Sequence, residues 1–575
     1  MHKTPRLIFL LTVLLLAAGR LDAGSVTIAW DPNTESDVTS YTVFWGTQSG
    51  VYTSNASAGD VTSYTVTNLV AGQTYYFAVE AVSSDGLTSP MSQEVSTTIP
   101  LTSPTGETEA QWMARFGITD MSADDDGDGV SNLDEFLAGT DPTVPNTWFL
   151  SEGATGYFQA RIALANPGTD TAEITATFVR EGTTPIVQQY TIPGLSRMTI
   201  QLNDIPGLEN TSVSTLITTQ RGGVIVERTM TWGGADSMDS GHTGKAVPQA
   251  STSWYFAEGD ARLFDTYLLL ANNNSTDATV NVTYTLDSGQ QVTDSYVVSA
   301  NQRRTIYTNN VPGVGKTSFA MTVLASAPIT AERAMYFSTA TQWWKGGTDS
   351  AGVEAPSTQW FIAEGHTGQT FAEYILLSNP NTSPATASIR YLLPQGSAVT
   401  QTYQLAASSR MTIFVNDVPG LADTDVSASI TSTLPIVAER SMYWPGRWGQ
   451  WYEGHNSVAL SQTGTKWVLG EGQDGGANNM ISYILIANPT DQAANVTLTV
   501  LRDNGLPPIV MQKTVNANSR LTVSSRQLSL TSGEQFGAIV ESTNAVPIAV
   551  ERSMYWDGSG LTWVAGTNET GTRLR

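Results

Sequence analysis

The chain has 575 residues, and 28 Lys plus Arg against 52 Asp plus Glu give it a net charge of -24. This acidic balance argues against nucleic acid and against an anionic membrane surface as partners. The chain has no cysteine, which excludes disulfides, thiol catalysis and cysteine-ligated zinc. With 50 Gly, 25 Pro and only 14% charged residues, and without a long helical pattern, the composition favours an all-β, turn-rich architecture.

Residues 1–23 have the pattern of a secretory signal peptide. Lys3 and Arg6 precede the apolar stretch 7–18, and the run Leu21-Asp22-Ala23 follows before Gly24. This stretch is too short to span a bilayer as a helix, and no second apolar stretch follows it. We therefore expect a secreted, extracellular protein, either free or held at the cell surface, without membrane insertion.

Short alternating segments separated by turns fill residues 24–100. Trp30 lies early, Tyr41 lies on the next strand, and the run 68–79 reads Asn-Leu-Val-Ala-Gly-Gln-Thr-Tyr-Tyr-Phe-Ala-Val. This segment resembles a fibronectin type III domain, and the resemblance implies an immunoglobulin-like sandwich in which Tyr75 is the corner tyrosine. Such modules serve as spacers and as binding platforms, so the resemblance carries no specific function.

A linker segment, residues 101–146, contains a twelve-residue acidic loop from Asp124 to Glu135. Its oxygen-bearing residues recur at the spacing of an EF-hand calcium loop, and Gly129 stands where the loop turns. Short helices are expected on either side, over 107–116 and 132–138. The loop resembles the calcium segments of dockerins and thrombospondin type 3 repeats, although a full dockerin has two loops; the alternative is a solvated acidic linker. The expected calcium ligands are Asp124, Asp126, Asp128, Asn132 and Glu135, with the backbone carbonyl of Val130.

Two motifs recur four times in the remaining residues. An opening motif begins at Trp148, Trp254, Trp360 and Trp467, and a closing motif contains the Glu-Arg pairs 227–228, 332–333, 439–440 and 551–552. The spacing of 105 to 112 residues is that of a small sandwich domain. The repeats resemble a widespread bacterial extracellular repeat with the pattern W-x-x-A-E-G, N-P and E-R-x-M-Y, which brings no known activity. We expect four immunoglobulin-like sandwiches: 147–252, 253–358, 359–465 and 466–575.

Within each repeat, the alternation of a strand puts one Glu and one Arg on apolar faces. Because an unpaired buried charge costs several kcal/mol, the two are predicted to pair. The alternative makes these glutamates catalytic acids, but no second carboxylate or nucleophile accompanies them, so the sequence favours a structural role and no catalytic residue. The predicted buried pairs are Glu152 with Arg228, Glu258 with Arg333, Glu364 with Arg440, and Glu471 with Arg552.

Two further expectations concern the outer surface of the repeats. The mid-repeat arginines, Arg197, Arg303, Arg410 and Arg520, alternate with apolar residues and are predicted to be exposed. Trp344, Trp451 and Trp563 each lie 11 residues after the closing Arg. They are candidate sugar-binding aromatics, and the alternative is that they cap a sandwich end or pack on the next repeat. The constant interval of 12 residues between closing and opening segments predicts a semi-rigid rod.

The sequence thus predicts a non-catalytic, secreted or cell-surface modular adhesin or structural stalk with calcium as its only cofactor. An alternative is a carbohydrate-binding accessory protein of an extracellular polysaccharide-degrading system, and a second alternative is an extracellular hydrolase. The expected partner is an extracellular protein or a polysaccharide.

Overall fold

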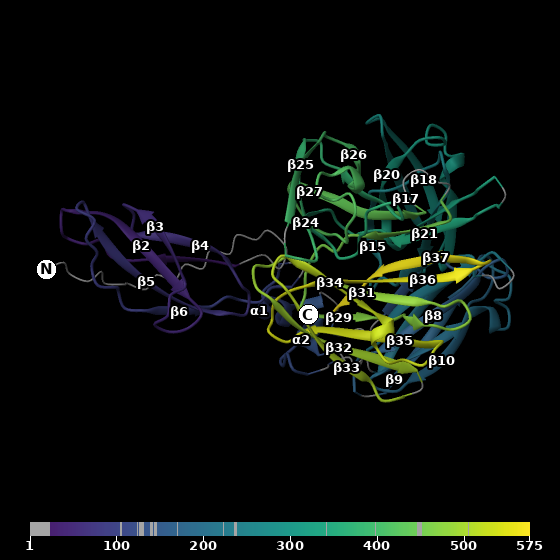
Figure 1. The fold of residues 1–575 in the computed structure, drawn as a ribbon, viewed down its shortest axis with the longest axis horizontal. Coiled ribbons are helices and arrows are strands. Elements are labelled where there is room, and N and C mark those ends of the chain that lie inside the picture. The colour runs from purple at the N-terminus through teal and green to yellow at the C-terminus, as the bar shows by residue number, and fades with distance from the viewer. Residues whose placement is uncertain are drawn as a thin grey trace. The chain divides into compact units, whose positions relative to one another are not determined.

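A computed structural model describes residues 24–575 apart from 104–105, 124, 126–130, 139–141, 143–146, 170, 222, 235–237, 341, 397, 446–450, 504 and 575. The expected signal peptide lies outside the described residues. The fold is all-β and consists of tandem β-sandwiches in two compact units. One unit holds the first sandwich and both helices, and the other holds the four repeats (Figure 1). No helix among the described residues is long and apolar enough to cross a membrane.

The first sandwich consists of six strands in two sheets: β1 (Gly24–Ala29) with β4 (Ser63–Leu69), and the order β3 (Ser54–Gly59), β2 (Val38–Gly46), β5 (Thr74–Ser83), β6 (Val95–Thr98). Trp30 and Tyr41 lie in its core with ring centroids 5.3 Å apart. The hydroxyl of Tyr75 accepts a hydrogen bond from the Val70 amide at 3.2 Å. Tyr75 therefore closes the corner that the sequence predicts for it.

Two short helices follow, α1 (Glu109–Phe116) and α2 (Asn132–Ala138). Thr108 caps α1 through a reciprocal capping box with Gln111, which satisfies amide groups that a helix start leaves free. Trp112 of α1 is fully buried and packs edge-on against Phe136 of α2, with centroids 5.5 Å apart. A small apolar core thus joins the two helices that flank the acidic loop.

Repeat 1 is a sandwich of two four-stranded arrays. One has the order β10 (Ile186–Ile192), β9 (Ala172–Val179), β12 (Ser214–Arg221), β7 (Thr147–Leu150). The other has the order β14 (Ser240–Lys245), β13 (Ile225–Trp232), β8 (Gln159–Asn166), β11 (Ser196–Gln201). The opening and closing motifs therefore lie in opposite sheets, on β7 and β13.

Repeats 2 and 3 have the same arrangement, except that one long strand passes from one sheet into the other. In repeat 2 the long strand is β20 (Phe319–Phe337), and in repeat 3 it is β27 (Ser427–Trp444). The other strands of repeat 2 are β15 (Ser251–Phe256), β16 (Phe264–Asn272), β17 (Ala278–Leu286), β18 (Gln291–Val298), β19 (Gln302–Tyr307) and β21 (Gly346–Ala351). Those of repeat 3 are β22 (Ser357–Ile362), β23 (Ala372–Asn379), β24 (Ala385–Leu392), β25 (Ala398–Leu405), β26 (Ser409–Phe414) and β28 (Glu453–Val458).

Repeat 4 again splits its closing strand in two, β35 (Glu534–Ser542) and β36 (Ala549–Gly558). Its other strands are β29 (Lys466–Leu469), β30 (Gln473–Asp474), β31 (Ile481–Asn488), β32 (Ala494–Asp503), β33 (Ile509–Val515), β34 (Ser519–Ser524), β37 (Leu561–Thr570) and β38 (Thr572–Arg573). Four 3-10 turns, Leu202–Asp204, Thr308–Asn310, Val415–Asp417 and Ser525–Gln527, occupy equivalent places in the four repeats.

The four repeats close into a ring. The strand that follows the closing motif in each repeat, β14, β21, β28 or β37, packs against the equivalent strands of two other repeats. In particular, β37 of repeat 4 packs against β14 of repeat 1. A parallel pairing of β11 with β32 joins repeats 1 and 4 a second time. In Figure 1 the yellow strands of repeat 4 accordingly lie beside the blue strands of repeat 1.

The predicted rod is therefore wrong. A fixed linker length does indicate a fixed orientation between neighbouring repeats, but the turn from one repeat to the next brings the fourth copy back to the first. Repeat 4 is accordingly not a free end of an array but contacts both of its neighbours in the ring.

Candidate functional site

Each interface of the ring is held by an ion pair between two closing motifs. The Arg of one repeat pairs with the Glu that precedes the Arg of the next repeat. The distances are 2.8 Å for Arg228–Glu332, 2.7 Å for Arg333–Glu439, 3.6 Å for Arg440–Glu551 and 3.0 Å for Arg552–Glu227. The last pair joins repeat 4 to repeat 1, so the four pairs form a closed cycle.

The same glutamates also bind the backbone of the adjacent repeat. Glu439 accepts a hydrogen bond from the Ala257 amide at 2.6 Å, and Glu551 accepts one from the Ala363 amide at 2.7 Å. Glu227 does the same at the Gly470 amide, 2.6 Å away, and Glu332 at the Ser151 amide. Each carboxylate thus holds the opening motif of one neighbour while it pairs with that neighbour's arginine.

The predicted pairing inside each repeat needs correction, although all eight side chains are buried as expected. Only Glu258 has its carboxylate near the predicted partner, 3.9 Å from Arg333. The carboxylate of Glu152 lies 3.9 Å from Arg303, that of Glu471 lies 3.1 Å from Arg161, and that of Glu364 accepts from the Ser553 hydroxyl. The physical reason is that the two motifs lie in opposite sheets, which leaves a neighbouring repeat closer to each carboxylate.

In three repeats a hydroxyl residue follows the closing Arg and binds an opening carboxylate, whereas in repeat 2 Ala334 follows Arg333. Thr229 donates to Glu471 at 2.9 Å, and Ser441 donates to Glu258 at 2.6 Å. Burial raises the pKa of the Glu152 and Glu258 carboxyls. At Glu471 burial acts in the same direction but is outweighed by nearby arginines, above all Arg161, and the pKa lies below its ordinary value.

The prediction that the mid-repeat arginines are exposed is wrong. The side chains of Arg197, Arg303 and Arg520 are buried, and that of Arg410 is only 4% exposed. Each donates to a backbone carbonyl in the opening motif of the preceding repeat in the ring. Those contacts are Arg197 with Gly470 at 3.3 Å, Arg303 with Ser151 at 3.5 Å, Arg410 with Ala257 at 3.5 Å and Arg520 with Gly365 at 2.5 Å.

The ring centre holds buried charges that differ from copy to copy. Asp349 of β21 pairs with Arg228 at 2.5 Å, whereas the equivalent position in β28 is Asn456. Glu453 of β28 accepts from the amides of Gly241 and Gly347 at 2.9 and 2.8 Å, and burial raises its pKa well above the ordinary value. Equivalent strands therefore surround the centre of the ring, but the charged side chains at equivalent positions differ from repeat to repeat.

Two of the four histidines are buried beside this centre. His242 shares a 3.1 Å hydrogen bond with the Tyr336 hydroxyl, and His455 shares a 3.0 Å bond with the Tyr555 hydroxyl. Burial lowers the pKa of both imidazoles well below the ordinary value, so both are neutral near pH 7.

The candidate aromatics stack on the tyrosine of the closing motif in their own repeat. The ring centroids are 4.4 Å apart for Trp344 and Tyr336, 4.3 Å for Trp451 and Tyr443, and 5.0 Å for Trp563 and Tyr555. All three tryptophans are half-buried. The carbonyls of Trp344 and Trp563 accept from the indoles of Trp232 and Trp444, which belong to the preceding repeats. These side chains therefore pack at ring interfaces and keep part of their surface exposed.

Of the predicted calcium ligands, Asn132 and Glu135 are described and the other four, Asp124, Asp126, Asp128 and Val130, lie outside the described residues. Both described side chains are fully buried at the start of α2. The Asn132 side chain donates to the Asp120 carbonyl at 2.7 Å and accepts from the Asp125 amide at 3.3 Å. Groups of carboxylates and imidazoles that could hold a metal ion are absent from the described part of the chain.

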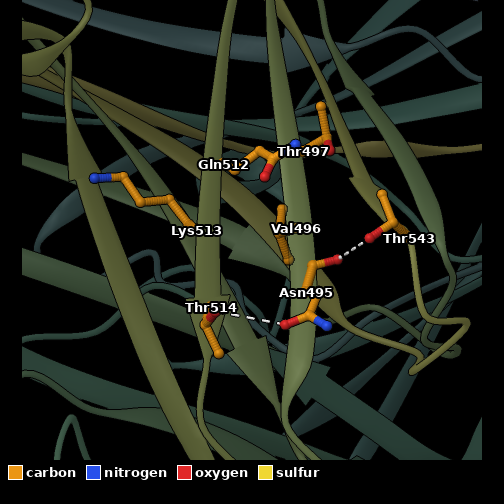
Figure 2. A pocket seen from close by; sticks show the side chains of 7 residues that line it. All are labelled: Asn495, Val496, Thr497, Gln512, Lys513, Thr514 and Thr543. Atoms are coloured by element: carbon orange, nitrogen blue, oxygen red, sulfur yellow. Dashed lines mark hydrogen bonds between the residues drawn. The ribbon is translucent and has the colours of Figure 1, made fainter.

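Two surface depressions accompany the ring. A cleft of about 250 Å³ lies between repeats 3 and 4 and is lined by Phe371, Tyr483, Tyr555, Trp563, His366 and Asp425, among others. A shallower groove of about 500 Å³ lies over β32 and β33 (Figure 2). The Thr543 hydroxyl in this groove donates to the Asn495 carbonyl at 3.1 Å, and Lys513 points away from Asn495. The groove contains no aromatic side chain, so the cleft is the better ligand site.

Comparison with known proteins identifies one domain. Residues 15–98 match the family model of the fibronectin type III domain, and the chain contains such a domain. The match begins inside the expected signal peptide, whereas the first described strand begins at Gly24. No curated protein sequence matches the chain.

Several solved structures are similar to parts of the chain. The sixth fibronectin type III domain of human fibronectin type III domain containing protein 3 is 25% identical, with a TM-score of 0.15, 18% of this chain and 90% of that chain covered. An Fn3-like protein from Clostridium thermocellum is 27% identical, with a TM-score of 0.13 and coverage of 18% and 94%. Thermotoga maritima 1070 is 13% identical, with a TM-score of 0.18 and coverage of 19% and 96%.

Proposed function

We propose that this protein is a non-catalytic, secreted or cell-surface modular adhesin in which the four-repeat ring is a rigid binding head. The observation that supports this proposal is that the charged residues of the repeated motifs make contacts between repeats. The closing-motif Glu and Arg and the mid-repeat Arg are all engaged in contacts between repeats. Side chains that are buried in ion pairs and hydrogen bonds between repeats are not available for acid–base chemistry.

A second candidate function is that of a carbohydrate-binding accessory protein. The specific observation in its favour is the cleft between repeats 3 and 4, where aromatic rings lie next to exposed hydrogen-bonding groups. Sugar sites combine these two features, because a pyranose ring has apolar faces and a hydroxyl-bearing edge.

Sedimentation with insoluble polysaccharides separates the two candidates. The protein would be incubated with cellulose, chitin, xylan and pectin and with a gelatin-coated resin as a protein surface. Retention on gelatin alone supports the adhesin that binds protein, and retention on a polysaccharide supports the second candidate. Release of reducing sugar from any of the polysaccharides would overturn the non-catalytic assignment.

We also propose calcium as the cofactor of the acidic loop. Asn132 and Glu135 contribute one amide oxygen and one carboxylate at the start of α2, both of which suit calcium. The role proposed for the ion is mechanical: it would hold α1 and α2 in a fixed arrangement between the fibronectin type III domain and the first repeat.

A further inference from the structure

The cleft between repeats 3 and 4 contains one copy of an aromatic platform that recurs around the ring. In three loops a tryptophan stacks on the tyrosine of the closing strand. Trp344 and Trp563 both adopt a left-handed backbone, with φ of 46° and 51°. The carbonyl oxygen of each accepts a hydrogen bond from an indole N–H of the preceding repeat. The loop geometry therefore fixes the orientation of each indole before any ligand arrives.

The copy between repeats 1 and 2 is covered by the chain itself. Trp344 has Tyr336 on one face, at an interplanar angle of 19°, and Trp343 on the other, at 3.9 Å and 18°. Trp343 is itself 58% exposed. A flat ring thus fits on the outer face of the platform, and in this copy the chain provides that ring.

The copy at Trp563 has no such cover. The residue before it is Thr562, and Trp563 stacks on Tyr555, 5.0 Å away at an angle of 28°. Trp563 lines the cleft together with Tyr483, whose ring is perpendicular to it at 82° and 6.5 Å away. The two rings form a corner that is open to the cleft.

The mouth of the cleft also differs from the other interfaces. His366 and Asp425 are hydrogen-bonded at 2.7 Å, and their side chains are 34% and 43% exposed. At the interface of repeats 1 and 2, the equivalent bridge joins Ala154 and Ser212 of repeat 1, which offer a single hydroxyl in place of the imidazole and the carboxylate. Between repeats 2 and 3, Asp260 of the equivalent bridge is bonded to Arg262 at 2.6 Å. The interface of repeats 3 and 4 thus combines an uncovered platform with a polar pair whose two side chains are both partly exposed.

The aromatic geometry favours a sugar over a cation. A quaternary ammonium group needs several ring faces arranged around it as a cage. Here Phe371, Tyr555 and Trp563 pack on one another with centroids 5.0 to 6.2 Å apart, so they form a continuous wall with no space between them for a cation. A wall of this kind suits the flat apolar face of a pyranose, and Asp425 and His366 lie where its hydroxyl groups would be bound.

We propose that this cleft binds one neutral pyranose ring, stacked on the free face of Trp563, with its hydroxyl groups hydrogen-bonded to Asp425 and His366. The cleft of about 250 Å³ has room for a single ring and not for a long oligosaccharide. The proposal rests on the second candidate function and adds the residues, the stoichiometry of one site per chain and the size of the unit recognised.

The test is titration of the full chain with methyl glycosides of glucose, galactose, mannose, xylose and N-acetylglucosamine, followed by tryptophan fluorescence and by calorimetry. Binding of one glycoside at one site per chain is expected. Asp425→Asn and Trp563→Phe should each weaken it at least about tenfold, because each removes a contact at the centre of the site. Asp423→Asn, two residues away and exposed, and Trp343→Ala, an exposed indole in another interface, are matched controls that should leave the affinity unchanged.

The outcomes distinguish the proposed site in the cleft from the carbohydrate-binding function on which it rests. Glycoside binding that Asp425→Asn and Trp563→Phe leave intact would overturn the cleft while the carbohydrate-binding function stands. Absence of binding to the whole glycoside panel, together with retention on a polysaccharide in the sedimentation assay, would also overturn the single-ring site. Absence of both would overturn the carbohydrate-binding function itself. Thermal unfolding of each variant confirms that the ring has remained folded.

Discussion

The arginines of the closing motif are fully buried and are surrounded by neighbours from two repeats. Arg333 bonds to the Glu258 carbonyl at 2.7 Å and to the Glu439 carboxylate at 2.7 Å. Removal of one partner of such a pair leaves a buried charge without compensation, which costs more than the pair itself contributes. The same residues that fix each interface are therefore also those at which a single substitution does most damage.

We predict that Arg333→Ala lowers the free energy of unfolding of the ring by about 3–5 kcal/mol, because Glu439 is left buried without its partner. Denaturation by urea, followed by tryptophan fluorescence, measures the change. The control is Arg262→Ala at the same interface, whose side chain is 52% exposed and whose loss should fall within about 0.5 kcal/mol. Equal, small losses in the two variants would show that the ion-pair cycle does not stabilise the ring.

A second prediction concerns Glu373 of β23, which is buried beside the opening turn of repeat 3. Burial raises its pKa from 4.5 to about 8. A carboxyl whose folded pKa exceeds its unfolded pKa binds its proton more tightly when folded. Its contribution to stability is therefore complete below about pH 4.5 and is lost as the pH rises through about 8.

Melting temperatures measured from pH 5 to 9 test whether stability falls as the pH rises. The wild-type ring should lose stability over this range, and Glu373→Gln, which cannot ionise, should flatten the dependence. Glu181→Gln, at an exposed position, is the control and should leave the profile unchanged. A profile for Glu373→Gln parallel to that of the wild type would show that another group carries the pH dependence.

At the scale of elements, α1 and α2 are held by a core of a few residues around Trp112. So small a core is expected to need support, and the proposed calcium ion between the helices would supply it. We predict that chelation with EGTA increases proteolysis between about residues 97 and 147 and leaves the repeats intact. Mass spectrometry of the fragments locates the cuts, and Glu135→Gln should show the cleavage of the chelated protein even when calcium is present. Equal cleavage of the wild type with and without calcium would leave the segment as an acidic spacer.

The strand pattern shows what the sequence could and could not predict. The alternation in the opening and closing motifs correctly predicted that Glu152 and Arg228 are buried. It could not identify their partners, because alternation gives the face of a strand and not the element that covers this face. A signal for the interface did exist in the sequence: the closing motif starts with the unbroken apolar run 224–226. Such a run is typical of a strand covered on both sides, and β13 is indeed buried at every position.

The mid-repeat arginines were misjudged for a related reason. Arg410 shares its strand face with Thr412 and Asn416, and a polar face ordinarily means solvent. In the ring this face is covered by the opening turn of the preceding repeat, whose carbonyls accept from the guanidinium. A polar face that contacts another copy looks the same in sequence as a polar face in water.

At the scale of the whole molecule, ring closure makes the four repeats interdependent. We predict that a chain ending at residue 465, which lacks repeat 4, melts at a lower temperature and self-associates, because Arg440 and Glu227 lose their partners. Size-exclusion chromatography with light scattering detects the association. A chain that begins at residue 147 and lacks the first unit keeps the whole ring and serves as the control; a monomeric, equally stable product of the first truncation would indicate independent repeats.

The four repeats that form the ring are segments of one polypeptide, and this distinguishes the ring from a tetramer of separate subunits. Such a tetramer dissociates on dilution, because its assembly obeys mass action. In this chain repeats 1 and 4 meet at an effective concentration that is fixed by the intervening repeats 2 and 3. Protein concentration therefore drops out of the assembly equilibrium, and one chain at extreme dilution keeps all four interfaces. Identical subunits would also have to carry identical interfaces, whereas covalently joined copies are free to close one cleft and leave another open.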